Sequence, residues 1–210
     1  MDKHMTIGTL QRLPDYLNYL KSLPQNSTSN ISATIIAKAI GLNDVLVRKD
    51  LASISNGGKP KIGYNTQELI KDIEHALGYD NVNNAVIVGT GNLGHALLSY
   101  EGFEKYGLDI VAGFDVDTNV IGTTVNGKNI LDVHKLKNLC ERMKIYLGII
   151  SVPDYAAQDV CDLMIESGIR AIWNFAPIHL NVPEYVLVQN ENLGISFAKL
   201  SNHLSEKMFE

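Results

Sequence analysis

A glycine-rich loop directly follows an apolar run that has the composition of a buried strand. The run 86–88 (Val-Ile-Val) leads into the GxGxxG spacing of residues 89–94. In this spacing the first glycine permits a tight turn, the second lets the backbone approach a pyrophosphate, and the third lets the next helix pack on the strand. Amide groups at the start of that helix then bind phosphate oxygens. The pattern predicts a dinucleotide site that includes Gly89, Thr90, Gly91, Asn92, Leu93 and Gly94.

An acidic side chain at the end of the next apolar run is suited to hold a ribose. Asp115 follows the run 110–114 and comes 21 residues after Gly94. A carboxylate there can accept hydrogen bonds from both hydroxyls of the adenine ribose and would repel a 2′-phosphate, so NAD(H) is favoured over NADP(H). The alternative is a tight strand-to-helix turn in a Rossmann-like domain that binds no nucleotide.

Later apolar runs end in residues that belong to the same edge of the predicted sheet. In an open α/β sheet, ligands bind beyond the carboxyl ends of the strands. The nicotinamide end of the cofactor is therefore expected to meet Val152, Pro153, Asn174, Ala176 and Pro177. Prolines that merely end strands are an equally good explanation of this pattern.

The elements that position these residues alternate between strands and helices from residue 84 onward. Apolar β-rich runs lie at 86–88, 110–114, 145–152, 171–173 and 185–188, and helical patterns lie at 92–100, 132–143 and 155–167. This alternation predicts an α/β domain with a doubly wound parallel sheet. A last helix carries an apolar stripe that fits either its own core or a dimer seam, formed by Leu193, Phe197, Leu200, Leu204 and Met208.

The first eighty residues have a different character, with four helical patterns and a glycine-rich segment. Helices are predicted over 8–23, over 33–40 after the cap Ser32, over 44–54 after the cap Asn43, and over 66–77 from the cap Thr66. The short connection between the second and third helices has the spacing of a helix-turn-helix. Residues 56–64 are too rich in Gly and Pro for a helix, so they are interpreted as a hairpin wing.

The third helix and the wing carry the candidate DNA contacts. Val47, Leu51 and Ile54 share one face and are expected to point inward. The side chains that then face outward and are placed against DNA are Arg48, Lys49 and Ser53, and on the wing Lys59 and Lys61 reach phosphate or the minor groove. An ordinary solvated helix face is the alternative.

Composition excludes several classes of protein. The chain has 210 residues, 45% of them hydrophobic, and a net charge of −5. Residues 1–80 carry 9 basic and 8 acidic side chains, while residues 81–210 carry 9 and 15, so the acidity belongs to the second part. No apolar run approaches the ~20 residues that span a bilayer, and the start lacks a secretory pattern, which predicts a cytoplasmic protein with no membrane segment. The two cysteines, Cys140 and Cys161, indicate neither a disulfide framework nor a metal site.

No group of residues suggests hydride chemistry or hydrolysis, and no substrate domain follows the sheet. A nucleotide site without a catalytic site favours a sensor over an enzyme. A small NAD-dependent oxidoreductase is one alternative, and it predicts cofactor turnover. A CoA-type nucleotide-binding module with a partner-binding helical domain is another, and it would be favoured if CoA outcompeted NADH.

The chain resembles Rex, the family of redox-sensing transcriptional repressors of bacteria, over nearly its whole length. The resemblance depends on the order and spacing of several short motifs together. They are the segment 47–51, Gly63-Tyr64, the run 88–97 with Tyr100 and Gly102-Phe103, the segment 114–117 and the segment 174–177.

This resemblance implies a homodimer that binds double-stranded DNA and senses NAD(H). Each subunit would have a winged-helix DNA-binding domain (1–80), a Rossmann NAD(H)-binding domain (81–192) and a C-terminal helix (193–210) that is exchanged between subunits. It implies repression of fermentation and respiration genes at an AT-rich palindromic operator, with release when NADH replaces NAD⁺.

The resemblance also implies a switch, and here the chain departs from the family. An arginine of the first helix, a tyrosine after the glycine loop and an aspartate before the last helix exchange contacts with redox state. The first two map to Arg12 and Tyr100, which is also a predicted cofactor contact, but the third falls at Asn192. The wing departs too, because lysines replace the family's usual pair of arginines. The change at Asn192 predicts a blunted or altered NADH response, and the change on the wing predicts an altered operator affinity or sequence preference.

Overall fold

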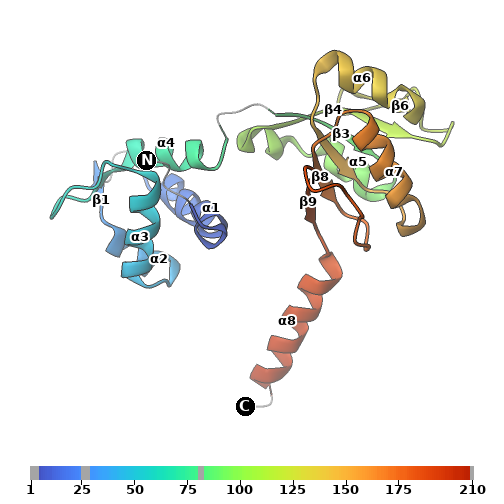
Figure 1. The fold of residues 1–210 in the computed structure, drawn as a ribbon. Helices are drawn as coiled ribbons and strands as arrows, with labels where there is room; N and C mark the ends of the chain where they lie inside the picture. The colour runs from blue at the N-terminus through green and yellow to red at the C-terminus, as the bar shows by residue number, and fades with distance from the viewer. Residues whose placement is uncertain (1–4, 25–28, 80–82, 209–210) are drawn as a thin grey trace. The chain divides into compact units, whose positions relative to one another are not determined.

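Two compact units make up the computed structural model, which describes residues 5–24, 29–79 and 83–208. The first unit comprises residues 1–81 and the second comprises residues 82–210 (Figure 1). In the described part of the first unit, four helices accompany a two-stranded antiparallel sheet. The elements are α1 (Ile7–Ser22), β1 (Asn30–Ile31), α2 (Ala33–Ile40), α3 (Asp44–Ile54), β2 (Tyr64–Asn65) and α4 (Thr66–Ala76).

Polar caps begin these helices close to where the sequence placed them. The side chains of Ser32 and Asn43 cap α2 and α3 as predicted, because their oxygens accept hydrogen bonds from free amides of the first turn. The start of α4 differs by one residue: Asn65 is the cap, and Thr66 is the first helical residue. The apolar faces of the four helices meet in one core whose fully buried members include Leu13, Ile36, Val47, Leu51, Leu69 and Ile73.

The wing is smaller than the hairpin predicted over 56–64. Within this segment the backbone pairs through a single antiparallel bridge between Lys59 and Gly63. Lys61, in the turn between them, has a φ of 65°, a left-handed conformation that costs free energy for a residue with a side chain. The strand that follows, β2, pairs with β1 rather than with the other side of the wing. Most of the wing is therefore a loop anchored at its base by β1.

Asp50 is a buried carboxylate that joins α1 to α3, and its side chain is 3% exposed. Arg12 donates to both of its oxygens, from Nε at 2.7 Å and from Nη2 at 2.8 Å. The hydroxyls of Thr9 and Tyr16 donate to the same carboxylate at 3.0 and 2.7 Å. Burial alone would raise the pKa of Asp50, but the bonds from Arg12, Tyr16 and Thr9 outweigh it and hold the pKa below its ordinary value. This cluster fixes α3, the helix that carries the predicted DNA contacts.

In the described part of the second unit, a seven-stranded sheet has the order β5-β6-β4-β3-β7-β8-β9. Every neighbouring pair is parallel except β5 and β6. Without the antiparallel edge strand, this is the 3-2-1-4-5-6 order of a doubly wound dinucleotide-binding sheet, as predicted. The strands are β3 (Asn83–Val88), β4 (Leu108–Asp115), β5 (Thr124–Val125), β6 (Lys128–Asp132), β7 (Leu147–Ile150), β8 (Ala171–Asn174) and β9 (Leu187–Asn190).

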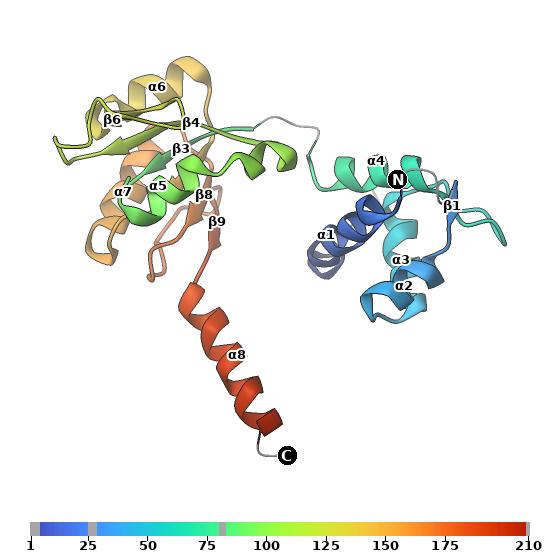
Figure 2. The ribbon, with the colours of Figure 1, turned by 180° about the vertical axis from the view of Figure 1, so that it is seen from behind.

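Helices cover both faces of this sheet. Alternate residues of β3 show why: Val86 and Val88 belong to the core under α6 (Leu136–Met143) and α7 (Asp154–Glu166), while Ala85 and Ile87 belong to the core under α5 (Asn92–Ser99). Figure 1 shows α6 and α7 on one side of the sheet, and Figure 2 shows α5 on the other. A strand that is buried on both faces needs apolar residues at every position. This explains why β3 could be predicted from a continuous apolar run in the sequence.

Several elements of the second unit were absent from the sequence prediction or displaced. The edge pair β5 and β6 was missed, as were two short 3₁₀ helices, η1 (Glu101–Tyr106) and η2 (Val133–Lys135). The strand predicted at 185–188 lies at Leu187–Asn190 instead. Edge strands bury little surface, so their sequences carry a weaker apolar pattern than the central strands.

The last helix, α8 (Leu193–Met208), exposes apolar side chains along its length. Phe197, Leu200 and Leu204 are 70%, 66% and 58% exposed. The alternative that this stripe packs on its own core is therefore wrong for these three residues. The side chains of Leu193 and Met208, the outer members of the stripe, lie outside the description that the structure gives.

We expect Asp50→Asn to lower the free energy of unfolding of the first unit by about 2 to 4 kcal/mol, because the Arg12 guanidinium loses its charged partner in a buried site. Tyr16→Phe, which removes one of the donors and no charge, should cost about 1 kcal/mol. Urea titration followed by far-ultraviolet circular dichroism measures both. Equal stability of Asp50→Asn and the natural protein at pH 7 would contradict the assignment.

The stability of the natural protein and that of Asp50→Asn should depend differently on pH. The pKa of Asp50 in the folded state lies below that of an unfolded aspartate, ~3.9. The stabilisation from Asp50 is then complete above about pH 4 and is lost as the pH falls through the folded-state pKa. Asp50→Asn lacks this contribution, so the stability gap between the two proteins should narrow on acidification.

Candidate functional site

A cavity of about 580 Å³ lies where the carboxyl ends of β3, β4 and β7 meet. The order of strands reverses on either side of β3, and ligands bind at such points in open α/β sheets. Six of the predicted cofactor residues line the cavity, namely Gly89, Thr90, Gly91, Asp115, Val152 and Pro153. The structure thus brings together the glycine loop, the acidic strand end and the first of the predicted proline-containing strand ends.

The glycines of the loop have the geometry that their roles require. Gly89 has a φ of 92°, in the left-handed region that favours glycine. A Cβ on Gly94 would overlap the carbonyl oxygen of Gly89, so helix α5 can approach the loop only at a glycine. A Cβ on Gly91 would meet nothing within 4 Å, which leaves space for a ligand beside the loop. Ser151, which the sequence did not single out, donates from Oγ to the carbonyl of Gly89 at 2.7 Å and steadies the turn.

Asp115 accepts four hydrogen bonds from its own chain. Thr90 donates to Oδ2 from both its amide nitrogen and its hydroxyl, each at 2.7 Å. The amides of Val116 and Asp117 donate to Oδ1 at 2.8 and 3.1 Å. Burial alone would raise the pKa of Asp115, but these bonds outweigh it and hold the pKa below its ordinary value. The carboxylate is therefore ionised at neutral pH and fixed in the cavity wall.

The rest of the cavity wall is mainly apolar and was not predicted. Val120, Val133 and Val160 contribute to it, and Tyr155 at the start of α7 is 84% exposed. Such a wall suits a flat aromatic base next to the ribose site. These residues come from three separate segments of the chain, so no spacing in the sequence groups them.

The remaining predicted cofactor residues lie outside this cavity. Asn92 and Leu93 are exposed on the first turn of α5, and Pro177 is exposed in the loop after β8. Asn174 is fully buried: its side chain accepts from the amide of Ala176 and donates to the carbonyl of Ile178 and to Oδ1 of Asn190. Its side chain thus shapes the loop after β8 and ties it to the end of β9.

Tyr100 begins a row of aromatic rings at the end of α5. Its ring is 52% exposed and meets Phe103 edge-on, with centroids 4.8 Å apart. Phe103 meets Trp173 at 5.7 Å, and Trp173 meets Phe175 at 4.8 Å. The indole of Trp173 also donates to Glu191, the second residue before α8. The row therefore connects the segment after the glycine loop with the start of the last helix.

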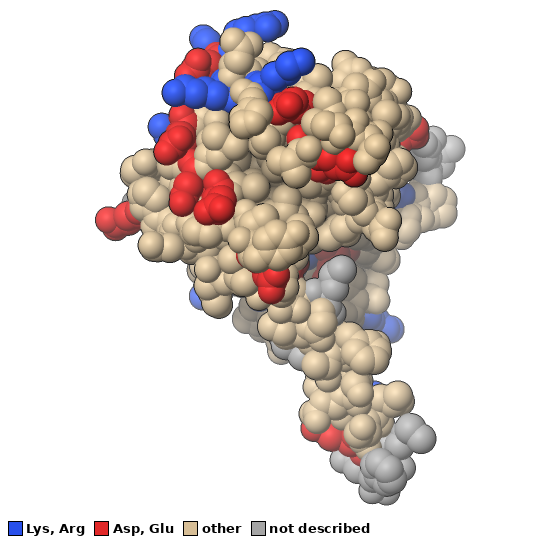
Figure 3. Space-filling model, turned by 90° about the vertical axis from the view of Figure 1, so that its right-hand side faces the viewer, with Lys and Arg blue, Asp and Glu red and all other residues tan. Residues whose placement is uncertain are grey.

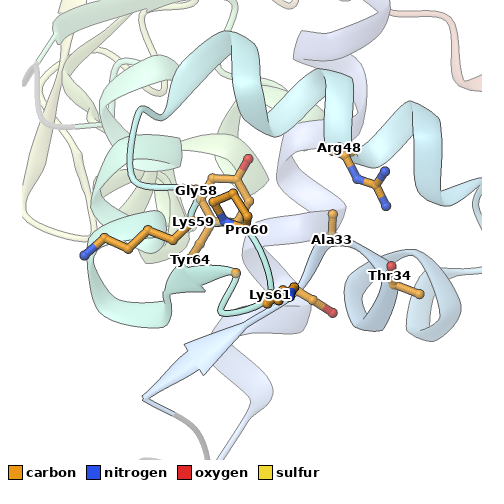
Figure 4. Close-up of a pocket in the computed structure, with 10 residues that line it drawn as sticks. Ala33, Thr34, Arg48, Gly58, Lys59, Pro60, Lys61 and Tyr64 are labelled. Carbon is orange, nitrogen blue, oxygen red and sulfur yellow. The ribbon is translucent and has the colours of Figure 1, made fainter.

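A second hollow, of about 480 Å³, lies in the first unit between α2, α3 and the wing (Figure 4). The start of α2, with its free amides, forms one wall, and the wing forms the other. Arg48 of α3 and Lys61 of the wing border it, while Figure 4 shows Lys59 extending away from Arg48. A helix N-terminus flanked by cations suits a phosphate group.

The predicted outward face of α3 is only partly free. Lys49 is exposed, and Arg48 is exposed but makes an ion pair with Asp44 at 3.1 Å. Ser53 is half-buried, and its hydroxyl donates to the backbone carbonyl of Asp50 at 2.6 Å. On the face of the second unit that Figure 3 shows, acidic side chains are spread over the surface and basic ones gather at one end.

Two family models match the chain, one for each unit. The model described as putative DNA-binding protein N-terminus matches residues 7–52, and the one described as CoA binding domain matches residues 80–178. Among curated relatives, the redox-sensing transcriptional repressor Rex of Porphyromonas gingivalis is 38% identical over 97% of this chain and 94% of its own length. Rex of Clostridium beijerinckii is 39% identical over 98% of this chain and 99% of its own. The chain belongs to the Rex family.

Solved Rex-family structures share the fold along nearly the whole chain. The repressor RSP in complex with β-NAD⁺ and operator DNA has a TM-score of 0.91 at 34% identity, covering 97% of this chain and 94% of that one. RSP in complex with β-NADH has a TM-score of 0.87 at 33% identity, covering 98% and 97%. Rex proteins are transcriptional repressors, which removes the oxidoreductase alternative.

The residues that the Rex resemblance assigned to a switch have defined surroundings here. Arg12 is bound by Asp50 within the first unit. Asn192 caps α8, since its Oδ1 accepts from the amide of Ile195 at 3.0 Å. Sequence reasoning identified Arg12 but missed Asp50, because an aspartate in a charged helix gives no sign that it is buried.

The two cysteines are unsuited to carry a redox signal. Cys140 and Cys161 are buried, and burial raises the pKa of each thiol to about 11. The thiolate is the reactive form, and it is scarce at neutral pH when the pKa is this high.

The residues that the structure describes include neither a candidate membrane helix nor a cluster of metal ligands. No helix among them has both the length and the apolar character needed to cross a bilayer. No group of three or more His, Cys, Asp or Glu in the same part of the chain could hold a metal ion.

Proposed function

We propose that this protein is a cytoplasmic transcriptional repressor that binds an AT-rich palindromic operator as a homodimer and is released from it by NADH. The observation that carries the proposal is the pairing of two sites on one chain: an ionised Asp115 beside a glycine loop, and a cation-flanked helix start on a helix-turn-helix. Curated Rex proteins are similar to this chain over nearly its whole length. The structure of RSP was solved in complex with NAD⁺ and operator DNA, and also in complex with NADH.

Asp115 favours NAD(H) over CoA or NADP(H) as the nucleotide. CoA carries a phosphate on its adenosine ribose, as NADP(H) does, and a fixed carboxylate repels that charge at short range. The proposed cofactor contacts are Gly89, Thr90, Gly91, Asn92, Leu93, Gly94, Asp115, Val152 and Pro153, with the nicotinamide reaching toward Tyr100, Asn174, Ala176 and Pro177.

The DNA contacts divide into positioning and reading roles. We assign phosphate contacts to Lys59, Lys61 and the start of α2, and base contacts in the major groove to Arg48 and Lys49, with Ser53 at the margin. The ion pair between Arg48 and Asp44 must break before the Arg48 guanidinium can bind DNA.

A gel shift on an AT-rich palindrome tests the function directly. The complex should form with the free protein or with NAD⁺, and NADH should dissociate it at concentrations where NADPH does not. Lys49→Ala should weaken binding at least tenfold, and Lys61→Ala should reduce the slope of log affinity against log salt by about one unit. Lys71→Ala, an exposed lysine of α4, is the matched control and should bind normally. An NADH-insensitive complex would reject the proposal.

The dimer is proposed from two exposed apolar surfaces. One is the face of α8, and the other is a groove of about 400 Å³ whose wall is almost wholly apolar and includes Leu108, Trp173 and Leu187. We propose that the α8 of a second copy covers such surface, in keeping with the helix exchange that the Rex resemblance implied. Burial would contribute ~1.5 to 3 kcal/mol for each of Phe197, Leu200 and Leu204.

Leu200→Lys should convert the dimer to monomer, as measured by light scattering, because it would bury a charge in the seam. Deletion of 193–210 should have the same effect. Asn202→Lys adds the same charge on the opposite face of α8, beside Glu206, and should leave the dimer intact. A dimeric deletion variant would show that the seam lies elsewhere.

Asn192 sets the strength of the proposed switch. An arginine–carboxylate pair is roughly twice as strong as a neutral hydrogen bond, so an amide at 192 weakens one of the two arrangements. Asn192→Asp keeps the cap of α8, because Asp and Asn cap helices equally well. We expect it to lower the NADH concentration that half-releases the operator, with Asn192→Ser as the cap-preserving control. An unchanged midpoint in Asn192→Asp would show that no carboxylate is needed.

A further inference from the structure

The Asp115 carboxylate has no unused hydrogen-bonding position. A carboxylate offers about four lone-pair sites, two on each oxygen. Thr90 fills the two on Oδ2, and the amides of Val116 and Asp117 fill the two on Oδ1. Three of these four donors are backbone amides, which are fixed by the turn itself. A ribose hydroxyl that contacts Asp115 therefore has to share a carboxylate oxygen with one of these donors.

The fourth donor, the hydroxyl of Thr90, is fixed as well. Thr90 is buried, with 6% of its surface exposed, and it lines the nucleotide cavity. Its methyl lies against Gly113 of β4, where a Cβ would come within 2.9 Å of it. Rotation about χ1 would move the methyl and the hydroxyl together, and the contact of the methyl with Gly113 opposes that rotation. Oγ1 thus stays 2.7 Å from Oδ2 of Asp115.

A threonine hydroxyl has one proton to donate and two lone pairs that accept. The proton of Thr90 is committed to Asp115, so only the lone pairs are available to a ligand. The negative charge on Asp115 also polarises the O–H bond and strengthens Oγ1 as an acceptor. A ligand hydroxyl can donate to it, whereas an ionised phosphate oxygen, itself an acceptor, cannot.

We propose that Thr90 is a specificity-determining residue, whose hydroxyl accepts a hydrogen bond from a ribose hydroxyl of the dinucleotide and relays it to Asp115. The inference rests on the proposed NAD(H) site and adds a second group to it. Selection against a phosphorylated ribose then comes from two acceptors in series, the Thr90 hydroxyl and the carboxylate behind it.

Calorimetric titration of the full chain with NADH and NADPH tests the relay. Thr90→Val keeps the methyl and the hydrogen bond from its backbone amide to Asp115, but it removes the hydroxyl. The NADH Kd should therefore rise about tenfold, and the ratio of the NADPH Kd to the NADH Kd should fall. Thr90→Ser keeps the hydroxyl and loses the methyl, and it should bind NADH within about threefold of the natural protein. If the threonine only packs against Gly113, Thr90→Ser would be the more damaged variant.

Ligands that lack one ribose hydroxyl allow a thermodynamic cycle in which the ligand and the protein are changed singly and together. The 2′-deoxy and 3′-deoxy forms of NADH should each be measured on the natural protein and on Thr90→Val. For the hydroxyl that contacts Thr90, the loss from the deoxy ligand and the loss from the mutation should be strongly non-additive. Fully additive losses for both ligands would overturn the relay, as would tighter NADH binding by Thr90→Val, which would mean that the hydroxyl competes with the ribose.

The pH profile supplies a readout that packing alone would not change. The Thr90 hydroxyl is one of the groups that lower the pKa of Asp115. Without it that pKa rises, so the NADH affinity of Thr90→Val should begin to fall at a higher pH on acidification. If the natural protein fails to bind NADH, the proposed function itself is wrong. If it binds NADH and Thr90→Val matches it in Kd, selectivity and pH profile, only the relay is wrong.

Discussion

The contact between Thr90 and Asp115 joins the two loops from which the nucleotide cavity is built. It ties the glycine turn after β3 to the end of β4, and Ser151 ties the same turn to the end of β7. Three strand ends are thus locked to one another by side-chain hydrogen bonds across a buried parallel sheet. These bonds fix the shape of the cavity wall, which reduces the ordering that binding would require. Its charge is equally fixed, because the bonds that orient Asp115 also keep it ionised.

In the first unit, the carboxylate of Asp50 joins two elements in the way that Asp115 does in the second unit. Asp50 holds α3 to α1 through Arg12, and the neighbouring residues on α3 are the proposed DNA contacts. Arg12 is therefore both a structural partner and, by family resemblance, a switch residue. A ligand can shift an equilibrium only through its differential affinity for the two states. Any group that draws Arg12 away must replace a bidentate hydrogen bond to a buried carboxylate. In the switch that we propose, a neutral amide at position 192 would compete for Arg12 less well than a carboxylate would.

Local patterns were predictable from the sequence, and distant pairings were not. Ser32, Asn43 and the glycine loop act within a few residues of themselves, so their roles could be predicted from spacing. Asp50 depends on Arg12, which lies 38 residues away, and Asp115 depends on Thr90, 25 residues away. The apolar cavity wall comes from residues that share no periodicity. Asn174 shows the limit most clearly: its position at a strand end was predictable, but its burial depends on Asn190 of the next strand.

In the proposed function the nucleotide site and the DNA site are coupled, and coupling of this kind is thermodynamically reciprocal. If NADH weakens operator binding by some factor, operator DNA must weaken NADH binding by the same factor. The measurement is the NADH Kd of the full chain, by calorimetry, with and without a saturating AT-rich palindrome. We expect the NADH Kd to be higher in the presence of operator, by the same factor by which NADH weakens operator binding. An NADH Kd that is the same with and without operator would contradict it.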